Sequence, residues 1–398
     1  MRARSRGGRG LRALVAPLVM AGVLTGLGAG QALASACVNA TGTTWKQVPS
    51  PSPGSNTNSL TGVAVVSSCQ AWAVGDYLNT SGPSHTLAEH WNGTAWTQVP
   101  SRDPGAFSNF LHGVAATSAA NAWAVGDYTG SRGGPTLALI ERWNGAAWKQ
   151  APSPEPSGSD NQLFSVAATA AANAWAVGSY ASGSAERTLI VHWNGAAWKQ
   201  VPSPNPAPAG GFNELTGVAA TSATDVWAVG DYRNASGVAQ TLIVHWNGTA
   251  WKRVPSPDPS ASLNNELFGV AASSPDNAWA FGEFISPHTP GTGANTLIVH
   301  WNGTAWKRVP SPNPGMPGFA TLSGMTATSA ANAWAVGGYI NNSGNGKTLI
   351  LHWTGTAWQQ VLSPCPGPST LNGVAATSPT NISAVGNTSS QTLALHCC

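Results

Sequence analysis

Four acidic residues and one histidine stand out because they fall where the chain otherwise repeats different residues. Glu214 and Glu266 each precede a run rich in Gly, Ala and Val, while Asp231, Glu283 and His288 follow a run of the type Trp-Ala-(Val/Phe)-Gly. Clustered carboxylates accept hydrogen bonds from hydroxyl groups and attract cations, and a pair of them can hydrolyse glycosides. We therefore expect a binding site for a polyhydroxyl or cationic partner here, with a glycoside hydrolase or lyase site as the alternative.

A second interpretation is that these residues are solvated parts of loops. Asp76 and Asp127 occupy the same place after the Trp-containing run as Asp231 and Glu283 do. An acidic residue at such a place commonly accepts a hydrogen bond from its own backbone in a turn. Only the elements that carry these residues can decide between the two interpretations.

Those elements follow from an internal repeat that is marked by tryptophan. The Trp-Ala-(Val/Phe)-Gly runs recur at spacings of 51, 52, 52, 52 and 55 residues. The three series of tryptophans that result are Trp72, Trp123, Trp175, Trp227, Trp279 and Trp334; Trp91, Trp143, Trp193, Trp246, Trp301 and Trp353; and Trp45, Trp96, Trp148, Trp198, Trp251, Trp306 and Trp358. Together they account for all 19 tryptophans, so every one is a repeat position.

Each repeat predicts four strands, which in the fourth unit are Leu215–Thr221, Val226–Val229, Thr241–Trp246 and Ala250–Val254. Alternating apolar residues and β-branched side chains favour strands, and Asn247-Gly248 predicts a hairpin between the third and the fourth. Small residues in the first strand suit the inside of a ring, and prolines after the fourth suit an unpaired outer edge.

These units predict an all-β fold, a seven-bladed β-propeller with four-stranded antiparallel blades. The first copy of the outer strand, Thr43 to Val48, precedes every inner strand, and the last unit ends at His396 without an outer strand. We therefore expect the N-terminal strand to complete blade 7 and close the ring. A stacked solenoid is the alternative, but it requires terminal capping repeats that the sequence lacks.

The repeat resembles the kelch family. The sequence Trp334-Ala-Val-Gly337-Gly338-Tyr339, followed by Thr348 to Trp353 and then Trp358, is similar to the kelch pattern of apolar strand, Gly-Gly, Tyr and a spaced Trp. It departs at the second Gly, which elsewhere is Asp76, Asp127, Ser179, Asp231 or Glu283. The chain also resembles Trp-rich propellers secreted by high-GC Gram-positive bacteria. The resemblance implies a propeller, a fold that hosts enzymes and binding modules alike.

In this fold the acidic residues gather on one face. Antiparallel connectivity places the loops between outer and inner strands on the same face as the loops between the second and third strands. The fifth unit has a long loop of the latter kind, Glu283 to Asn295, which contains His288. We therefore predict the ligand site on this face near blades 4 and 5, formed by Glu214, Asp231, Glu266, Glu283 and His288.

Other chemistry finds little support in the sequence. A histidine recurs at one position of the third strand, at His90, His192, His245, His300, His352 and His396, and we expect it to be structural and bound to a backbone group. No metal site, cofactor or catalytic residue is predicted, and whether the protein is an enzyme stays open. The motifs of serine hydrolases, zinc proteases and phosphate-binding loops are missing from the sequence.

The N-terminus predicts export. Five arginines, a short apolar run from Ala13 to Leu27 and small residues near Ala36 are typical of a signal peptide over residues 1–34, cleaved after Ala34 or Ala36. The propeller would then occupy 37–398 of a secreted monomer without a membrane span; a lipoprotein anchored at Cys37 is the alternative. Without those five arginines, 13 basic residues face 15 acidic ones, which disfavours nucleic acid and leaves an extracellular glycan or protein as partner.

The cysteines predict a covalent lock on the closed ring. Cys37 precedes the closing strand, Cys397 and Cys398 end the chain beside it, and Cys69 lies in the neighbouring blade, which leaves Cys365 unpaired. We predict that Cys37 and Cys69 pair with Cys397 and Cys398, above all Cys37 with one of the two. Such a link closes a loop of some 360 residues and would stabilise the fold by roughly 5 kcal/mol. Peptide mapping should recover the linked peptides; a free or lipidated Cys37 would contradict the prediction.

Overall fold

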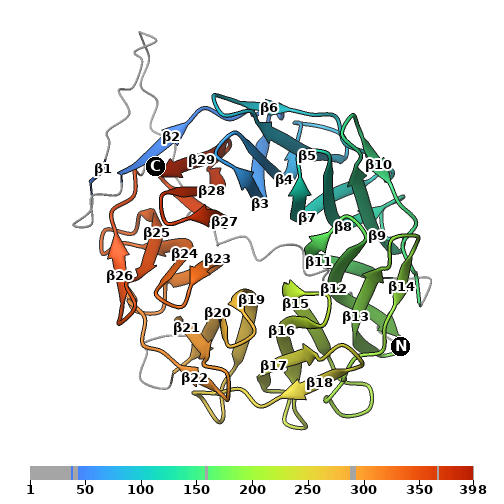
Figure 1. Ribbon diagram of the computed structural model, residues 1–398, viewed down its shortest axis with the longest axis vertical. Helices are drawn as coiled ribbons and strands as arrows, with labels where there is room; N and C mark the ends of the chain where they lie inside the picture. The colour runs from blue at the N-terminus through green and yellow to red at the C-terminus, as the bar shows by residue number, and fades with distance from the viewer. Residues whose placement is uncertain (1–36, 39–43, 157–159, 287–292, 365–366, 398) are drawn as a thin grey trace. The chain divides into compact units, whose positions relative to one another are not determined.

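The computed structural model describes residues 37–38, 44–156, 160–286, 293–364 and 367–397, and the regular elements in these residues are β-strands. They form seven antiparallel sheets arranged as blades around a central channel (Figure 1). This confirms the predicted seven-bladed propeller. Within the described residues no helix is long and apolar enough to cross a membrane, and the predicted signal peptide lies outside them.

The blades are numbered in chain order, and each contributes one strand to four concentric layers. The innermost strands are β3 (Thr57–Ser67), β7 (Ser108–Ser118), β11 (Asn161–Ala170), β15 (Asn213–Ser222), β19 (Asn265–Ser274), β23 (Ala320–Ser329) and β27 (Ser369–Ser378). The second strands are β4 (Gln70–Leu78), β8 (Asn121–Thr129), β12 (Asn173–Ser182), β16 (Asp225–Arg233), β20 (Asn277–Ile285), β24 (Asn332–Ile340) and β28 (Asn381–Thr388).

The third strands are β5 (Ser84–Trp91), β9 (Thr136–Trp143), β13 (Ala185–Trp193), β17 (Ala239–Trp246), β21 (Ala294–Trp301), β25 (Gly346–Trp353) and β29 (Thr392–Cys397). The outer strands are β6 (Trp96–Gln98), β10 (Trp148–Gln150), β14 (Trp198–Gln200), β18 (Trp251–Val254), β22 (Trp306–Arg308), β26 (Trp358–Val361) and, in blade 7, β2 (Thr44–Val48).

The N-terminal strand closes the ring as predicted. Strand β2 pairs antiparallel with β29, with Trp45 opposite Cys397 and Val48 opposite Ala394 (Figure 1). A further short strand, β1 (Cys37–Val38), pairs with the outer side of β2, so blade 7 has five strands and not the four expected.

The glycine of each Trp-Ala-(Val/Phe)-Gly run lies within the second strand and does not end it. In blade 4 the predicted strand stopped at Val229, whereas β16 continues to Arg233. Gly230 lies opposite Leu215, next to a bulge between Leu215 and Gly217. A Cβ at this position would collide with the carbonyl oxygen of Glu214. Glycine therefore allows the close approach of the two strands that lets the ladder continue past the bulge.

The loops of the Asn-Gly hairpins are one residue longer than the sequence suggested. Trp246 and Trp251 face each other across β17 and β18, which makes residues 247–250 a four-residue loop. Gly248 adopts φ of 90°, and Asn247 serves as a side-chain acceptor: its Oδ1 accepts hydrogen bonds from the backbone N–H groups of Thr249 and Ala250, both at 3.1 Å. The asparagine thus organises the loop through its side chain.

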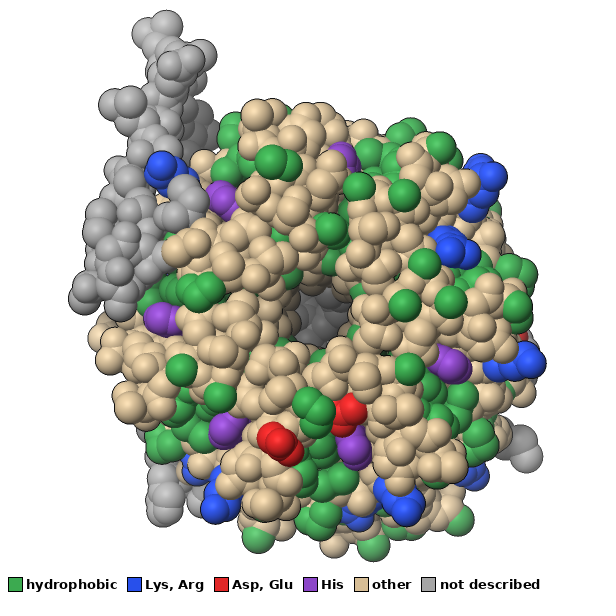
Figure 2. All heavy atoms as spheres, viewed as in Figure 1, with side chains coloured by type: hydrophobic (Ala, Val, Ile, Leu, Met, Phe, Trp, Pro, Cys, Tyr) green, Lys and Arg blue, Asp and Glu red, His purple; other side chains and the backbone are tan. Residues whose placement is uncertain are grey.

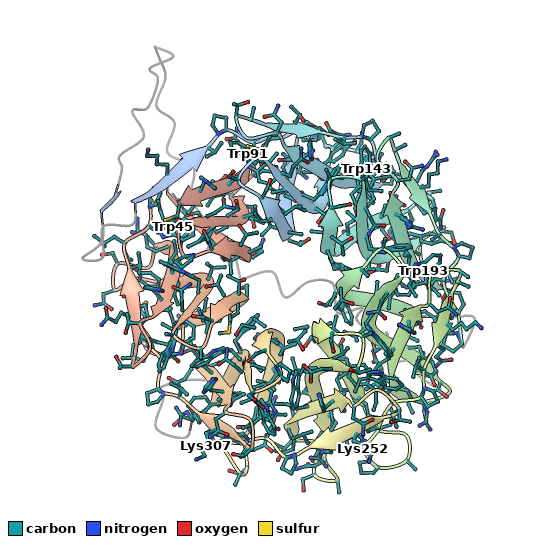
Figure 3. The ribbon with its side chains drawn as sticks, in the orientation of Figure 1. Trp45, Trp91, Trp143, Trp193, Lys252 and Lys307 are labelled. Atoms are coloured by element: carbon teal, nitrogen blue, oxygen red, sulfur yellow. The ribbon has the colours of Figure 1, made fainter. Side chains whose placement is uncertain are left out.

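The contact surfaces between neighbouring blades, here called seams, are filled by tryptophan. Trp227 of blade 4 is buried against two tryptophans of blade 5, with ring centroids 5.0 Å from Trp301 and 5.2 Å from Trp306. Its interplanar angle to Trp306 is 87°, the edge-to-face arrangement that aromatic quadrupoles favour. Figure 3 places Trp45, Trp91, Trp143 and Trp193 around the ring, with Lys252 and Lys307 at the outer edge.

The seam between blades 7 and 1 departs from this rule at three positions. Ser383 stands where the other second strands have tryptophan, and Ala394 stands where blades 2 to 6 have isoleucine. Glu89 occupies a position at which blades 3 to 5 have valine; its side chain is fully buried. Ser50 Oγ donates a 2.7 Å hydrogen bond to Glu89 Oε2, while Oε1 has no hydrogen-bond partner among the described residues. This seam is therefore the least apolar one.

Replacing Trp227 by alanine should destabilise the protein by about 3–5 kcal/mol, because the large cavity cannot be closed by the surrounding rigid sheets. Thermal or denaturant unfolding measures this, with Lys252→Ala as a control because Lys252 is exposed on the outer strand of the same blade. A Trp227→Ala variant as stable as the wild type would mean that tryptophan does not hold the seams together.

Stability should fall as pH rises, in part because of Glu89. Burial, opposed by the hydrogen bond from Ser50, raises the pKa of Glu89 from 4.5 to about 8. The folded state holds this proton more tightly than the unfolded chain, so the stability present below pH 4.5 is lost as pH rises towards 8. Glu89→Val should reduce the slope by at most about 1.4 kcal/mol per pH unit.

Glu141 provides a matched comparison, because it occupies the equivalent position of blade 2 and burial raises its pKa to about 7. Glu141→Val should flatten the profile only below that pH, whereas Glu89→Val should do so up to about 8. Unfolding curves recorded across this pH range give the slope of stability against pH. If Glu89→Val keeps the wild-type slope, Glu89 does not bind a proton on folding.

Candidate functional site

The structure brings the four predicted acidic residues into two opposed pairs. Glu214 on β15 lies directly opposite Asp231 on β16, and Glu266 on β19 lies directly opposite Glu283 on β20. Side chains at opposed positions of an antiparallel pair have Cβ atoms about 4.5–5.5 Å apart. The two pairs occupy equivalent positions of adjacent blades. Asp231 and Glu266 are buried, while Glu214 and Glu283 are half-buried.

Their local setting differs from the prediction in one respect. All four acids lie inside strands and not in loops or turns, because the second strand runs past its glycine and the inner strand begins earlier than expected. The predicted loop from Glu283 to Asn295 shrinks accordingly, since β20 ends at Ile285 and β21 begins at Ala294. His288 lies outside the described residues.

The acids belong to a ring of paired positions, here called the mouth ring, at the end of the channel where inner strands begin. Its other pairs are Ser59–Asp76, Phe110–Asp127, Gln162–Ser179, Thr321–Gly338 and Thr370–Asn387. Side chains near it bridge adjacent blades: Asn372 Nδ2 donates to Leu60 O of blade 1 at 2.8 Å and to Asn387 Oδ1 at 3.2 Å. The mouth ring is thus polar and linked between blades.

A histidine that the sequence analysis did not single out joins this ring. His112 occupies the bulge of β7, and its Nε2 lies 2.6 Å from Asp127 Oδ1. The His112 side chain is 14% exposed and that of Asp127 is 6% exposed, so water screens the pair only weakly. The equivalent position varies between blades, and His112 is the one titratable residue there; the others are Thr61, Phe164, Thr216, Phe268, Ser323 and Asn372.

The pKa of His112 and that of Asp76 each depend on burial and on the charge of the other residue. Burial acts to lower the pKa of His112, but the hydrogen bond to Asp127 and the nearby charge of Asp76 raise it overall. Burial raises the pKa of Asp76 to about 6; the charge of His112 opposes that rise and the charge of Asp127 adds to it. A proton-dependent cluster therefore lies at the mouth ring of blades 1 and 2.

Aromatic rings flank His112 on two sides. Its ring centroid is 6.2 Å from that of Phe110 and 5.8 Å from that of Phe164 on the inner strand of blade 3, and both phenylalanines are half-buried. The mouth ring and the bulge residues next to it therefore offer flat apolar faces in blades 2 and 3 and carboxylates in blades 1, 2, 4 and 5. Such a surface is suited to a ligand with cationic or hydroxyl groups next to apolar ones.

The recurring histidines of the third strands are structural, but their partners are side chains and not the predicted backbone groups. His245 Nε2 lies 2.6 Å from Asp225 Oδ1, and its ring stacks on Trp227 with centroids 4.1 Å apart. In blade 2 Arg142 takes this place, donating to Asn121 Oδ1 and covering Trp123. Figure 2 shows histidines spread around one face and not converging on a point.

No group of three potential metal-ligating side chains is found in the part of the chain that the structure describes. Of the predicted disulfides, only Cys69–Cys397 would join two described side chains, and no bond is found there; Cys69 is exposed. Cys37 and Cys397 both lie opposite Trp45, on its two sides. Two strand spacings, about 9.5 Å, exceed the Cα separation of a disulfide, which disfavours that pair. Links to Cys398, which lies outside the described residues, stay a prediction.

Comparison with known proteins supports the fold alone. No family profile matches the chain, and no curated protein matches it. Among solved structures it is similar to YCF48 bound to D1 peptide (12% identity, TM-score 0.53, 91% of this chain and 97% of that one). It is also similar to YCF48 from Cyanidioschyzon merolae (14%, 0.52, 88% and 98%) and to the GH74 xyloglucanase from Xanthomonas campestris (15%, 0.51, 88% and 53%).

Proposed function

We propose that this protein is a non-catalytic binding propeller that recognises an extracellular protein or glycan at its mouth ring. The observation that carries the proposal is where the blades differ. Residues that recur in most blades fill seams and organise loops, whereas Phe110, His112, Glu214 and Glu266 stand at positions that vary between blades, at one end of the channel. A ring of otherwise equivalent blades has no preferred site until some of its blades differ.

The chemistry of the mouth ring favours a polypeptide with basic and apolar side chains. Carboxylates in blades 4 and 5 attract cationic groups, and Phe110 and Phe164 supply apolar faces in blades 2 and 3. The YCF48 structure with a bound D1 peptide has a fold similar to that of this chain. A glycan remains the other candidate, because carboxylates beside aromatic rings also bind sugars.

The location of the protein is part of the proposal. The basic and apolar N-terminal segment supports a signal peptide over residues 1–34, and we propose with it a secreted monomeric propeller over 37–398. Lipid attachment at Cys37 is the alternative, and N-terminal sequencing of the exported protein separates the two.

A glycoside hydrolase or lyase is the second candidate function, and one observation favours it. The Glu266–Glu283 pair has the directly opposed placement that brings two carboxyl groups close together. Retaining glycosidases use carboxyl groups about 5–5.5 Å apart. If the protein releases product from a polysaccharide, and if this activity requires both Glu266 and Glu283, catalysis and not simple binding would be established.

The experiment is a glycan array and a peptide array with the wild type, followed by titration of each hit. Glu214→Gln combined with Glu266→Gln should weaken binding about 10- to 100-fold, because two charge-assisted hydrogen bonds or ion pairs are lost. Asp276→Asn is the matched control, since Asp276 is exposed in the turn after an inner strand, on the opposite face. Unchanged affinity in the folded double variant would place the site elsewhere.

A further inference from the structure

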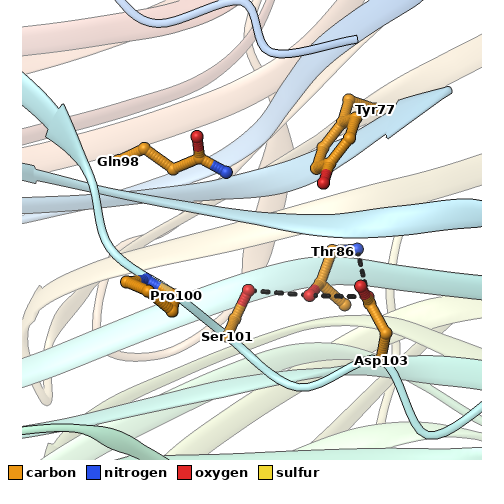
Figure 4. A pocket seen from close by; sticks show the side chains of 6 residues that line it. All are labelled: Tyr77, Thr86, Gln98, Pro100, Ser101 and Asp103. Atoms are coloured by element: carbon orange, nitrogen blue, oxygen red, sulfur yellow. Dashed lines mark hydrogen bonds between the residues drawn. The ribbon is translucent and has the colours of Figure 1, made fainter. Parts of the chain in front are cut away.

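A second, separate surface lies at the outer end of blade 1. A shallow pocket of about 320 Å³ is lined by Tyr77, Thr86, Gln98, Pro100, Ser101 and Asp103 (Figure 4). Asp103 is fixed by the strand next to it: its Oδ1 accepts hydrogen bonds from Thr86 N at 2.7 Å and from Thr86 Oγ1 at 3.0 Å. Burial, together with the charge of Asp103, raises the pKa of Tyr77. The pocket thus combines an aromatic ring with a carboxylate.

Blade 4 contains the equivalent residues, and there an arginine of the chain itself covers the tyrosine ring. Tyr232, Thr241 and Asp258 occupy the positions of Tyr77, Thr86 and Asp103, and the backbone N–H of Thr241 likewise donates to Asp258 Oδ1, at 2.7 Å. Arg253 lies over the Tyr232 ring, with its guanidinium carbon 4.7 Å from the ring centroid. Its Nη2 also donates to the Tyr232 hydroxyl at 2.9 Å.

The charge of the Arg253 guanidinium affects the pKa of Asp258 in blade 4. Burial raises the pKa of Asp258, the hydrogen bonds from Thr241 oppose the rise, and the charge of Arg253 opposes it as well. Blade 5 repeats the aromatic part of the contact, where Arg308 lies 4.4 Å from the ring centroid of Phe284. In two blades, therefore, the chain places its own guanidinium over this aromatic ring.

In blade 1 the residue at the arginine position is Gln98. The register fixes the correspondence: Gln98 lies opposite Glu89 on β5, as Arg253 lies opposite Val244 on β17. The tyrosine and the aspartate are kept, but the cation that covers the tyrosine ring in blade 4 is replaced by a shorter, neutral side chain. His85 stacks on Tyr77 and its Nδ1 lies 2.8 Å from Asp103 Oδ2, yet it is not among the residues that line the pocket.

We propose that the blade 1 pocket binds an arginine side chain of a partner polypeptide, in the way that Arg253 occupies the equivalent place in blade 4. The guanidinium would stack on Tyr77 and donate to Asp103, the two contacts that its planar fork is suited to make. The ammonium group of lysine lacks this planar face. The proposal does not depend on the mouth ring, which lies at the inner ends of the blades.

Other blades lack one part of this combination. Blade 3 has Tyr180 and Gln200 but carries Asn205 in place of the aspartate. Blade 2 has Glu155 there, and burial raises the pKa of Glu155 to about 7, so that its negative charge is incomplete at neutral pH. Among the blades whose residues at these positions are described, only blade 1 has both a tyrosine and an aspartate and lacks an internal arginine.

The test is a titration of the full chain with Nα-acetylarginine amide and, separately, with Nα-acetyllysine amide. The readout is the NMR chemical shift of backbone amides. The amide of Thr86 reports on blade 1 and that of Thr241 reports on blade 4, because each donates to the aspartate in question. We expect the arginine derivative to shift Thr86 and leave Thr241 unmoved. The lysine derivative should bind more weakly.

Two reciprocal variants make the test specific. Gln98→Arg supplies an internal guanidinium and should weaken binding at Thr86 about tenfold or more, whereas Gln200→Arg in blade 3 is the matched control and should leave it unchanged. Arg253→Gln empties blade 4 and should create a second response, at Thr241. Equal binding of both amino acid derivatives, or a wild-type response in folded Gln98→Arg, would overturn the proposal, as would a silent Thr241 in Arg253→Gln.

Discussion

Each blade of this propeller is covered by the tryptophans of its neighbour, and the rest of the structure depends on that contact. A second-strand indole such as Trp227 is buried between two indoles of the next blade, and its Nε1 has no hydrogen-bond acceptor among the described residues. Apolar area and ring geometry therefore provide the stabilisation. A chain with few charged residues can hold seven sheets in a ring because one large contact is repeated at nearly every seam.

The same constraint explains where the ring is weakest. Blade 7 is assembled from both ends of the chain, and its seam with blade 1 lacks the second-strand tryptophan, which is Ser383. His396 stacks on Trp91 with centroids 6.1 Å apart and partly takes over the contact, but the buried Glu89 carboxyl introduces a cost of desolvation there. The strand that closes the ring, β2, thus lies next to the least apolar seam.

Features that recur with the repeat could be predicted from the sequence, because each copy supports the others. The blade number, the closing strand and the burial of Trp227 belong to this class. Features that depend on one contact between particular atoms could not. The second strand passes Gly230 only because the inner strand bulges there, and the buried side-chain partner of His245 is visible only once β16 and β17 are paired. For the site, the face and the blades of Glu214 and Glu266 could be predicted, whereas the His112–Asp127 pair required the bulge of β7.

The repeated residues thus account for stability, and we propose that the residues in which the blades differ at the channel mouth account for recognition. The most direct measurement is amide hydrogen exchange of the full chain with and without a ligand identified by array screening. Protection confined to the first residues of β7, β11, β15 and β19 is the result that this account predicts. Protection of the Asn-Gly loops on the opposite face, or equal protection in all seven blades, would contradict it.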